Sequence, residues 1–489
     1  MTVVLVAATI TGGCKTARQV AARYPSSDME AIYAAALPNA QRNPVVLVHG
    51  FAGAILLRVE DGANVWGTLF TKDSLPPAKQ PGLKALALDI DGLQRPIDSS
   101  QLLFIADDTR AVEILEKVRA DAGPVDVNVG MYAALVDLME GSGYSECQSD
   151  PEAITSLEVP PCLTFFYDWR QDNVGSAIRL GRFLEMARSR IAEIANRDEA
   201  GTDQEVKFDL VAHSMGGLVA RYFLRYGARD VLEDTEPRIT WAGAEYLDRL
   251  IAISTPNFGA MRVLKEMVMG RRYPVVKFEP AMIATWVSAY QMLPREELKI
   301  WLDMEGGPIE ANVLSARTWA KNGWGPFAPG QDKYLTWLLP SESTPEGRQD
   351  RIRAFMDAAF DRAQRFFQAM DQHADTDCPT ELILFAADVQ PTPARAAVVE
   401  KDGRQVLRFE NTKNLTLKAP GDGSVTRASA VADERLFGEN SGFLTSPIPW
   451  NRKVFLTDMH LTLLGNATFQ NNLLHILLET PPSGKAQDH

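Results

Sequence analysis

The chain has 489 residues and a formal net charge of −13, with 46% of the residues hydrophobic and 23% charged. Such a composition is typical of a globular protein with a sizeable core, built as one large domain with insertions or as two or three domains. The acidic balance argues against a nucleic-acid partner, because binding to a phosphate backbone relies on clustered Lys and Arg. No apolar run approaches the roughly 20 residues that are needed to span a bilayer.

The first 40 residues allow two interpretations. Residues 3–10 are a short apolar run followed by TGGC at Cys14, an arrangement that resembles a bacterial lipoprotein signal. No Lys or Arg precedes this run, however, and it is short for such a signal, so a buried first strand or a frayed start is the alternative. The localisation therefore stays open between an exported protein anchored through Cys14 and a cytoplasmic protein.

Short apolar runs alternate along the rest of the chain with helix-like segments. The runs that read as buried strands are residues 44–49, 163–167, 206–212, 249–254, 381–387 and 453–457. Between two of them, residues 176–195 repeat apolar side chains at helical spacing. The alternation predicts an α/β fold in which helices cover both faces of a mostly parallel sheet.

The sequence KFDLVAHSMGGLVARYFLRYG places Ser214 between a predicted strand and an amphipathic helix. In a nucleophile elbow the serine occupies a strained strand-to-helix turn, so the residues two before and two after it must be small. Ala212 and Gly216 meet this requirement, with alanine in place of the usual first glycine. The dipole of the following helix would favour negative charge that develops beside the serine. Ser214 is therefore the candidate nucleophile.

Acyl transfer from a serine also needs backbone N–H groups that stabilise the oxyanion, usually one after the serine and one after an early strand. Met215 supplies the first by its position. The strand at 44–49 runs into the glycine-flanked turn HGFAG, and Phe51 in this turn is the candidate for the second donor. Taken alone, HGFAG would be an ordinary strand-ending turn, and only the elbow downstream gives it a functional interpretation.

Residues 260–375 break the alternation of strands and helices. This stretch carries five of the nine tryptophans and many methionines, a composition that suits a mobile surface for apolar ligands. An inserted helical subdomain with its own small core is the plainer interpretation, and we predict that it forms a cap or lid over the active site. The α/β-hydrolase core would then comprise residues 41–259 and 376–489.

His460 is the candidate general base. It follows the last predicted strand, in TDMHLTLL, where the base belongs in the chain order of serine, acid and histidine. The other histidines have other predicted places: His49 in the oxyanion turn, His213 beside the nucleophile but pointing away from it, His373 in a polar linker, His475 in the closing helix and His489 at the end of the sequence. We expect His460 to take the Ser214 proton and to return it to the leaving group.

Two aspartates compete to orient His460. Asp388 ends the strand LILFAAD, where many α/β hydrolases carry this acid, and Asp422 lies in the glycine-flanked turn PGDGSVT. Asp458 is a third possibility, although its closeness to His460 in the backbone makes a productive contact difficult. Fold logic alone leaves the choice between Asp388 and Asp422 open.

Several blocks of the chain resemble the lecithin:cholesterol acyltransferase family, which includes lysosomal phospholipases, plant phospholipid:diacylglycerol acyltransferases and bacterial relatives. In chain order the blocks are PVVLVHGFAGAIL, VWGTLF with Trp66, MYAALVDLMEGSGY, FFYDWR, AHSMGG, LIAISTPNFGA, YQMLP, PTP at 391–393 and GDGSV at 421–425. His49 stands where the family more often has proline, Ser424 where it has threonine, and the lid does not match closely.

The resemblance implies roles for individual residues. The family's catalytic aspartate lies in the GDGTV turn and maps onto Asp422, and its histidine-leucine pair maps onto His460 and Leu461. Phe51 and Met215 take the oxyanion role by the same resemblance. In the YDWR block, we predict that Asp168 and Arg170 form a structural ion pair that fixes a loop near the site, so they are not counted as catalytic.

The resemblance also implies a serine-dependent reaction on a lipid. Ser214 would form an acyl-enzyme with a glycerophospholipid or other lipid acyl ester, with a lipid or membrane surface as a transient partner. Water or an alcohol would then take the acyl group. The sequence does not distinguish a phospholipase from an O-acyltransferase, and it leaves the oligomeric state open. The alternative is a lipase or carboxylesterase for smaller or neutral esters. A catalytically silent binding protein is a third interpretation, although silent members usually lose the serine, the histidine or an oxyanion turn, and this chain keeps them.

The histidines and cysteines show no ligand spacing, so neither a metal nor an organic cofactor is predicted. Cys147 and Cys162 lie 15 residues apart in a loop-like stretch and could pair in an oxidising compartment. Cys378 would then be left over.

Overall fold

The fold is described from a computed structural model of the chain. The structure describes residue 32 and residues 35–69, 84–121, 126–197, 206–272, 277–295, 298–309, 311–437 and 445–482. Cys14 and the apolar run before it lie outside the described residues, so lipidation at Cys14 stays a prediction.

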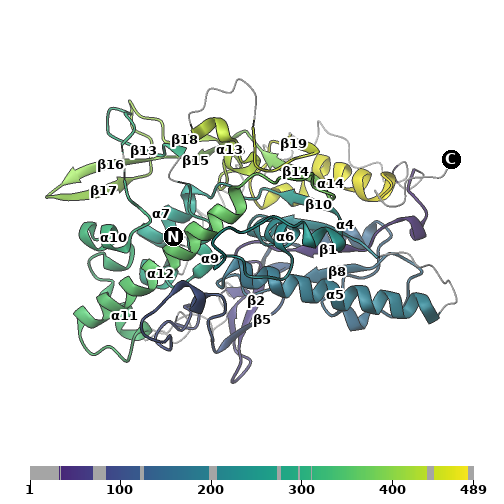
Figure 1. Cartoon of the computed structure of the whole chain (residues 1–489), viewed down its shortest axis with the longest axis horizontal. Coiled ribbons are helices and arrows are strands. Elements are labelled where there is room, and N and C mark those ends of the chain that lie inside the picture. Colours follow the sequence, from purple (N-terminus) through teal and green to yellow (C-terminus); the bar gives the residue numbers. More distant parts are fainter. Residues whose placement is uncertain are drawn as a thin grey trace.

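A six-stranded parallel sheet forms the centre of the molecule (Figure 1). Its strands lie in the order β19-β14-β10-β9-β1-β8, and every neighbouring pair is parallel. Their bounds are β19 Arg452–Leu456, β14 Glu381–Ala387, β10 Leu247–Ile253, β9 Phe208–His213, β1 Val45–Val48 and β8 Cys162–Phe165. Strands buried on both faces need continuous apolar sequences, which is why these runs were predictable. The predicted α/β fold with a parallel sheet is confirmed.

Helices cover both faces of this sheet, because successive side chains of a strand point to opposite sides. Val46 and Val48 pack in one core cluster with helices α5 (Asn173–Arg197) and α6 (Met215–Tyr226). Val45 and Leu47 pack in a second cluster with α4 (Ala133–Gly141) and α14 (Ala467–Leu474). All residues of α6 are buried, so the helix that follows Ser214 is fixed by packing along its whole length.

The segment between β10 and β14 carries most of its described secondary structure as helices, and its standing as an inserted subdomain stays a prediction. Its helices are α7 Met261–Met269, α8 Pro280–Ile283, α9 Val287–Gln291, α10 Ala316–Asn322, α11 Asp332–Leu338 and α12 Pro345–Asp371. Buried aromatic side chains of α12, such as Phe355 and Phe360, join the same core cluster as α5 and α6. Within the described ranges, no helix is long and apolar enough to cross a membrane. The role of the segment as a lid stays a prediction.

Several short strands that the sequence analysis did not predict lie outside the central sheet. They are β2 Ala54–Arg58, β3 Asn64–Trp66, β4 Thr68–Leu69, β5 Thr109–Ile114, β6 Lys117–Asp121, β7 Asp126–Gly130, β11 Arg271–Arg272, β12 Lys277–Phe278, β13 Trp301–Leu302, β15 Gln390–Pro393, β16 Ala396–Lys401, β17 Arg404–Arg408 and β18 Lys418–Gly421. The β16–β17 hairpin pairs with β13 of the helical segment and projects from one end of the molecule (Figure 1). Strands β15 and β18 pair antiparallel, and β18 leads directly into the turn that carries Asp422. A short helix, α13 (Arg427–Val431), follows that turn.

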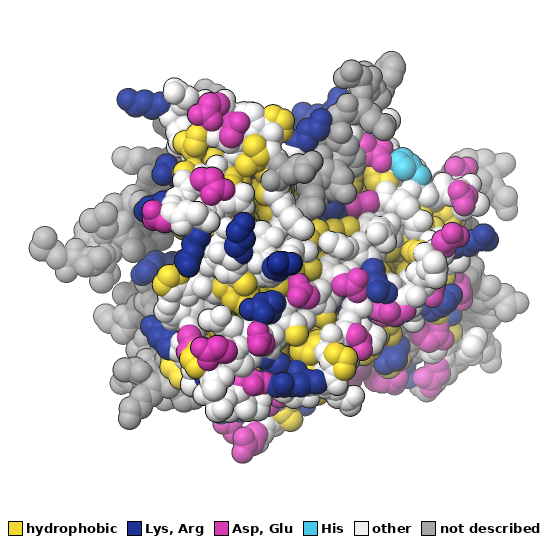
Figure 2. Space-filling model, turned by 60° about the vertical axis from the view of Figure 1, so that its left-hand side comes forward, with side chains coloured by type: hydrophobic (Ala, Val, Ile, Leu, Met, Phe, Trp, Pro, Cys, Tyr) yellow, Lys and Arg dark blue, Asp and Glu magenta, His cyan; other side chains and the backbone are white. Residues whose placement is uncertain are grey.

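The surface carries charges of both signs. On the face shown in Figure 2, Lys and Arg side chains are interspersed with Asp and Glu side chains and with hydrophobic ones. The net charge of −13 is therefore not matched by a large acidic patch on this face.

Candidate active site

Ser214 lies at the end of the buried strand β9, directly before helix α6. Its backbone has φ 56° and ψ −125°, a conformation that costs free energy in any residue with a Cβ and that surrounding structure must enforce. Close packing of the turn against the neighbouring strand holds this conformation. A Cβ added to Gly216 would lie 2.8 Å from the Val48 carbonyl oxygen. The small residue at this position is therefore required by the neighbouring strand β1, and the turn has the geometry of a nucleophile elbow.

The structure brings three of the sequence-predicted residues together. The His460 Nε2 atom lies 2.9 Å from the Ser214 Oγ atom, and the His460 Nδ1 atom lies 2.7 Å from the Asp422 Oδ2 atom. Ser214 and His460 are separated by 246 residues in the chain. Ser214 is only 7% exposed, so the serine is enclosed while the histidine side chain remains 18% exposed.

Asp422 is held as a carboxylate by its surroundings. Its Oδ1 atom accepts hydrogen bonds from the backbone amides of Ser424 (2.8 Å) and Val425 (2.7 Å), and its own carbonyl oxygen accepts one from the His460 amide (3.0 Å). Burial disfavours the charge, but the facing His460 ring and these amides outweigh it and lower the pKa of Asp422 to about 2. The group is thus ionised at neutral pH and can stabilise a protonated His460.

The two rival aspartates have other partners. The Asp388 carboxylate lies 3.7 Å from the guanidinium of Arg427, and Asp458 accepts a hydrogen bond from the side chain of Asn466. The structure therefore places Asp422, and neither rival, against the His460 ring.

The turn HGFAG lies directly beside the elbow. A Cβ added to Gly50 would come within 2.7 Å of the Ser214 Cβ, so the turn can approach the serine only because glycine occupies this position. Neither the Phe51 amide nor the Met215 amide donates a hydrogen bond to another residue in the described ranges. Two uncommitted N–H groups flanking a serine are what an oxyanion site requires, so both residues remain candidates for that role.

The other two histidines near the site are buried and neutral. Burial lowers the pKa of His49 to about 4 and that of His213 to about 3. The His49 Nδ1 atom is 2.7 Å from the Gly50 carbonyl oxygen, and its Nε2 atom accepts from the Tyr167 amide at 3.1 Å. As expected, the His213 ring points away from Ser214, toward Tyr132 and the His460 carbonyl. Sequence reasoning missed Tyr132, whose hydroxyl reaches both the HGFAG turn and His213.

The predicted ion pair between Asp168 and Arg170 is confirmed, with 2.7 Å between the Arg170 Nη2 and Asp168 Oδ2 atoms. Arg170 also pairs with Asp107 and donates to the carbonyl oxygens of Ala85 (2.9 Å) and Ala87 (3.3 Å). The guanidinium thus ties the strand-ending loop to residues 85–87, as a structural ion pair should.

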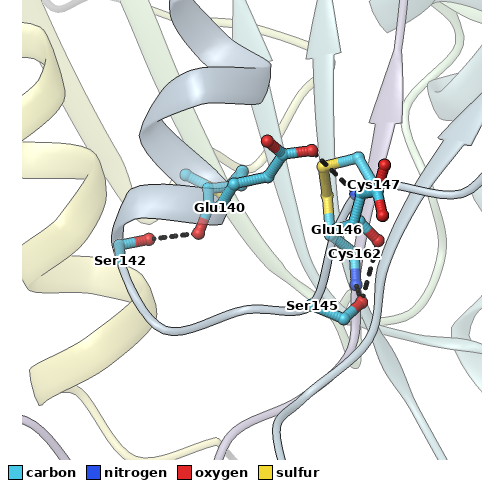
Figure 3. The surroundings of a disulfide bond; sticks show 7 residues. Glu140, Ser142, Ser145, Glu146, Cys147 and Cys162 are labelled. Carbon is cyan, nitrogen blue, oxygen red and sulfur yellow. Dashed lines mark hydrogen bonds between the residues drawn. A yellow bond between two sulfur atoms is a disulfide. The ribbon is translucent and has the colours of Figure 1, made fainter.

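Cys147 and Cys162 form a disulfide with 4.5 Å between their Cα atoms (Figure 3). The bridge lies at the first residue of β8, and the neighbouring Ser145 Oγ atom accepts from the Cys162 amide at 3.0 Å. Cys378 is a free cysteine. The pairing that the spacing allowed is therefore present in the structure.

The parallel sheet and the serine elbow define an α/β-hydrolase fold. A family model described as lecithin:cholesterol acyltransferase matches residues 106–329, so the resemblance carried by the sequence motifs is confirmed. A search of curated proteins found no match. Together, the fold and the family match support a serine ester hydrolase or acyltransferase that acts on lipid acyl esters.

Two solved structures are similar to this chain at low sequence identity. One is described as the crystal structure of a Tle4–Tli4 complex, with 17% identity, a TM-score of 0.50 and coverage of 88% of this chain and 97% of that chain. Another is lipase 1 from Pelosinus fermentans, with 12% identity, a TM-score of 0.34 and coverage of 90% and 99%. At these identities, the first likeness supports the fold alone.

Proposed function

We propose that the protein is a serine-dependent phospholipase or lipid O-acyltransferase, with Ser214 as nucleophile, His460 as general base and Asp422 as the residue that orients His460. The observation that carries the proposal is the continuous chain of contacts from Ser214 Oγ to His460 Nε2 (2.9 Å) and from His460 Nδ1 to Asp422 (2.7 Å). A serine hydroxyl is a weak nucleophile unless a neighbouring base removes its proton, and His460 is within the distance that proton transfer requires.

The reaction has two steps. In the first, Ser214 attacks the ester carbonyl while His460 takes its proton, and the amides of Phe51 and Met215 stabilise the negative charge on the carbonyl oxygen. His460 then gives the proton to the departing alcohol, which leaves Ser214 acylated. In the second step, His460 activates water or an acceptor alcohol, which attacks the acyl-enzyme and releases an acid or a new ester.

The proposed donor is a glycerophospholipid or another lipid acyl ester. The family match supports a lipid substrate, and the aromatic side chains around Phe51 support an apolar one. The ring centroid of Phe51 lies 4.7 Å from that of Trp169 and 5.5 Å from that of Trp286. The surroundings of Phe51 are therefore apolar, which suits an ester with a long acyl chain.

Incubation with a phospholipid labelled in its acyl chain, in the presence of sterol, diacylglycerol and short alcohols, tests the proposal. Free fatty acid alone would identify a phospholipase, and a new labelled ester would identify a transferase. Activity confined to short soluble esters would contradict the phospholipid donor. A fluorophosphonate probe should label the wild type and not the Ser214→Ala variant, and an unlabelled wild type would contradict the catalytic proposal as a whole.

A further inference from the structure

The Tyr132 hydroxyl lies between the two halves of the candidate active site. It accepts a hydrogen bond from the Gly50 amide (2.7 Å) and lies 2.9 Å from the His213 Nδ1 atom. The His213 Nε2 atom, on the other side of the ring, lies 3.1 Å from the His460 carbonyl oxygen. Tyr132 is 1% exposed and His213 is 2% exposed, so water cannot easily substitute for either partner.

The partners fix the direction of each hydrogen bond. A carbonyl oxygen only accepts hydrogen bonds, so the His213 Nε2 atom must carry a proton and donate a hydrogen bond to the His460 carbonyl oxygen. Because burial keeps this ring neutral, with its pKa lowered to about 3, the Nδ1 atom carries no proton and must accept. The Tyr132 O–H therefore donates to His213, and its oxygen accepts from Gly50. Every group in the sequence Gly50, Tyr132, His213 and His460 then has a partner of the right kind.

The surroundings of Tyr132 leave it little freedom. A Cβ added to Gly53 would come within 2.8 Å of both the Tyr132 ring and the His49 Nδ1 atom. On the backbone side, the amides of Met131 and Tyr132 donate to the Glu116 carbonyl oxygen at 2.7 and 3.2 Å. A buried side chain so closely packed can hold its hydroxyl in one place, which a positioning role requires.

We propose that Tyr132 and His213 are positioning residues that fix the oxyanion turn and the His460 loop relative to one another; the inference rests on the proposed function. One end of the connection holds Gly50, whose neighbour Phe51 is the candidate oxyanion donor. The other end holds the backbone of His460, whose ring contacts Ser214. Both groups must lie in the correct place in the transition state, and a displacement of about 1 Å can lower a rate about 100-fold.

Tyr132→Phe is the first test, because it removes one hydroxyl and leaves Gly50 and His213 without their partner. We expect kcat on an ester substrate to fall about 10- to 100-fold with KM changed by less than about threefold, since neither residue is placed to bind substrate. Tyr144→Phe is the matched control. Tyr144 is buried in the same core cluster, and its hydroxyl has no hydrogen-bond partner within the described residues, so kcat should stay at the wild-type value.

His213 variants separate positioning from stability. In His213→Gln the side-chain amide can still donate to the His460 carbonyl, whereas His213→Leu cannot. We expect His213→Gln to retain more of the wild-type kcat than His213→Leu. The double variant Tyr132→Phe, His213→Leu should be no slower than the slower single variant, because both changes break one connection. Unfolding midpoints measured for every variant show which losses in rate accompany a loss of fold.

The outcomes distinguish this inference from the proposed function. A wild type that hydrolyses no ester and is not labelled at Ser214 overturns the proposed function and the inference with it. An active wild type with an unchanged kcat in Tyr132→Phe overturns the inference alone. The inference is also overturned if the decreases in kcat of the two single variants multiply in the double variant. It is overturned as well if the decrease in rate of each variant matches its fraction of unfolded protein.

Discussion

At the scale of single residues, the Asp422 carboxylate is tied to the site more firmly than its two rivals. Its side chain accepts hydrogen bonds from two backbone amides and contacts the His460 ring. Its backbone carbonyl oxygen accepts a hydrogen bond from the His460 amide. Since backbone and side chain both reach His460, a side-chain substitution at Asp422 removes the charge that faces the His460 ring while the backbone contact remains. This separation makes the acid testable by an isosteric substitution.

Asp422→Asn should lower kcat by about four orders of magnitude, because an amide in this place holds His460 in the wrong tautomer and provides no negative charge. Asp388→Asn should change kcat by less than about threefold, because the Asp388 carboxylate faces Arg427. Initial rates on a chromogenic ester check both. The reverse order of effects would transfer the role to Asp388.

The strained backbone of Ser214 predicts a conflict between activity and stability. Glycine adopts φ 56° without the steric cost that a Cβ brings. Ser214→Gly should therefore be more stable than Ser214→Ala by about 1 kcal/mol, although both lack the proposed nucleophile. Urea unfolding of the two variants measures the difference. Equal stabilities would show that the elbow stores no strain.

Sequence reasoning could propose Ser214 and His460 because chain order, small neighbours and the short list of histidines can all be read from the sequence. It could not choose between Asp388 and Asp422 without the family resemblance, because the two lie close together: Asp422 forms a β-bridge with Gln390, two residues after Asp388. It missed Tyr132 altogether. The partners of this residue lie 82 and 81 positions away, and no local pattern indicates which buried hydroxyl will meet them.

At the scale of secondary-structure elements, the strands of the central sheet were predictable to within about two residues. Residues 249–254 were predicted where β10 spans Leu247–Ile253, and 453–457 where β19 spans Arg452–Leu456. Such strands are apolar throughout because both faces are buried. The β16–β17 hairpin was not predicted, since several of its residues are exposed and its short strands carry mixed polar and apolar side chains.

The disulfide at the start of β8 should contribute measurably to stability. For a closed loop of about 15 residues, the chain-entropy model gives about 3 kcal/mol, so the double variant Cys147→Ala, Cys162→Ala should unfold at a lower urea concentration. Cys378→Ala is the control and should retain most of the stability. Reducing agent should bring the wild type close to the double variant and leave the double variant unchanged. A wild type insensitive to reduction would contradict a stabilising bridge.

At the scale of the whole molecule, buried ionisable groups set how stability depends on pH. The pKa of His213 is about 3 in the folded state, below its ordinary value of 6.5, so the unfolded chain takes up a proton first as the pH falls. Above pH 6.5 the buried neutral ring therefore does not lower the free energy of unfolding. As the pH falls from 6.5 toward 3, the unfolded chain is protonated at His213 and the free energy of unfolding decreases progressively. Asp107 and Asp209 act in the opposite direction, since burial raises the pKa of each to about 6.

Comparing the wild type with His213→Gln isolates the histidine, because both chains carry the two aspartates. Between pH 6.5 and pH 5, the wild type should lose about 2 kcal/mol of unfolding free energy relative to the variant. Urea unfolding at several pH values measures this difference. A difference that is constant with pH would mean that His213 titrates normally in the folded protein.

The position of the disulfide has a consequence for how molecules of this protein meet one another. Strand β8 is an edge strand of the central sheet. Gln148 lies along its outer side, where its amide donates a hydrogen bond to the Cys162 carbonyl oxygen (2.9 Å) and its carbonyl oxygen accepts one from the Thr164 amide (2.8 Å). The bridge at Cys147 fastens that segment in place. Once the bridge is reduced, the outer row of N–H and C=O groups can be uncovered, and an open strand edge is a template for pairing with another chain. We therefore expect reduced protein to self-associate while its active-site geometry is still intact.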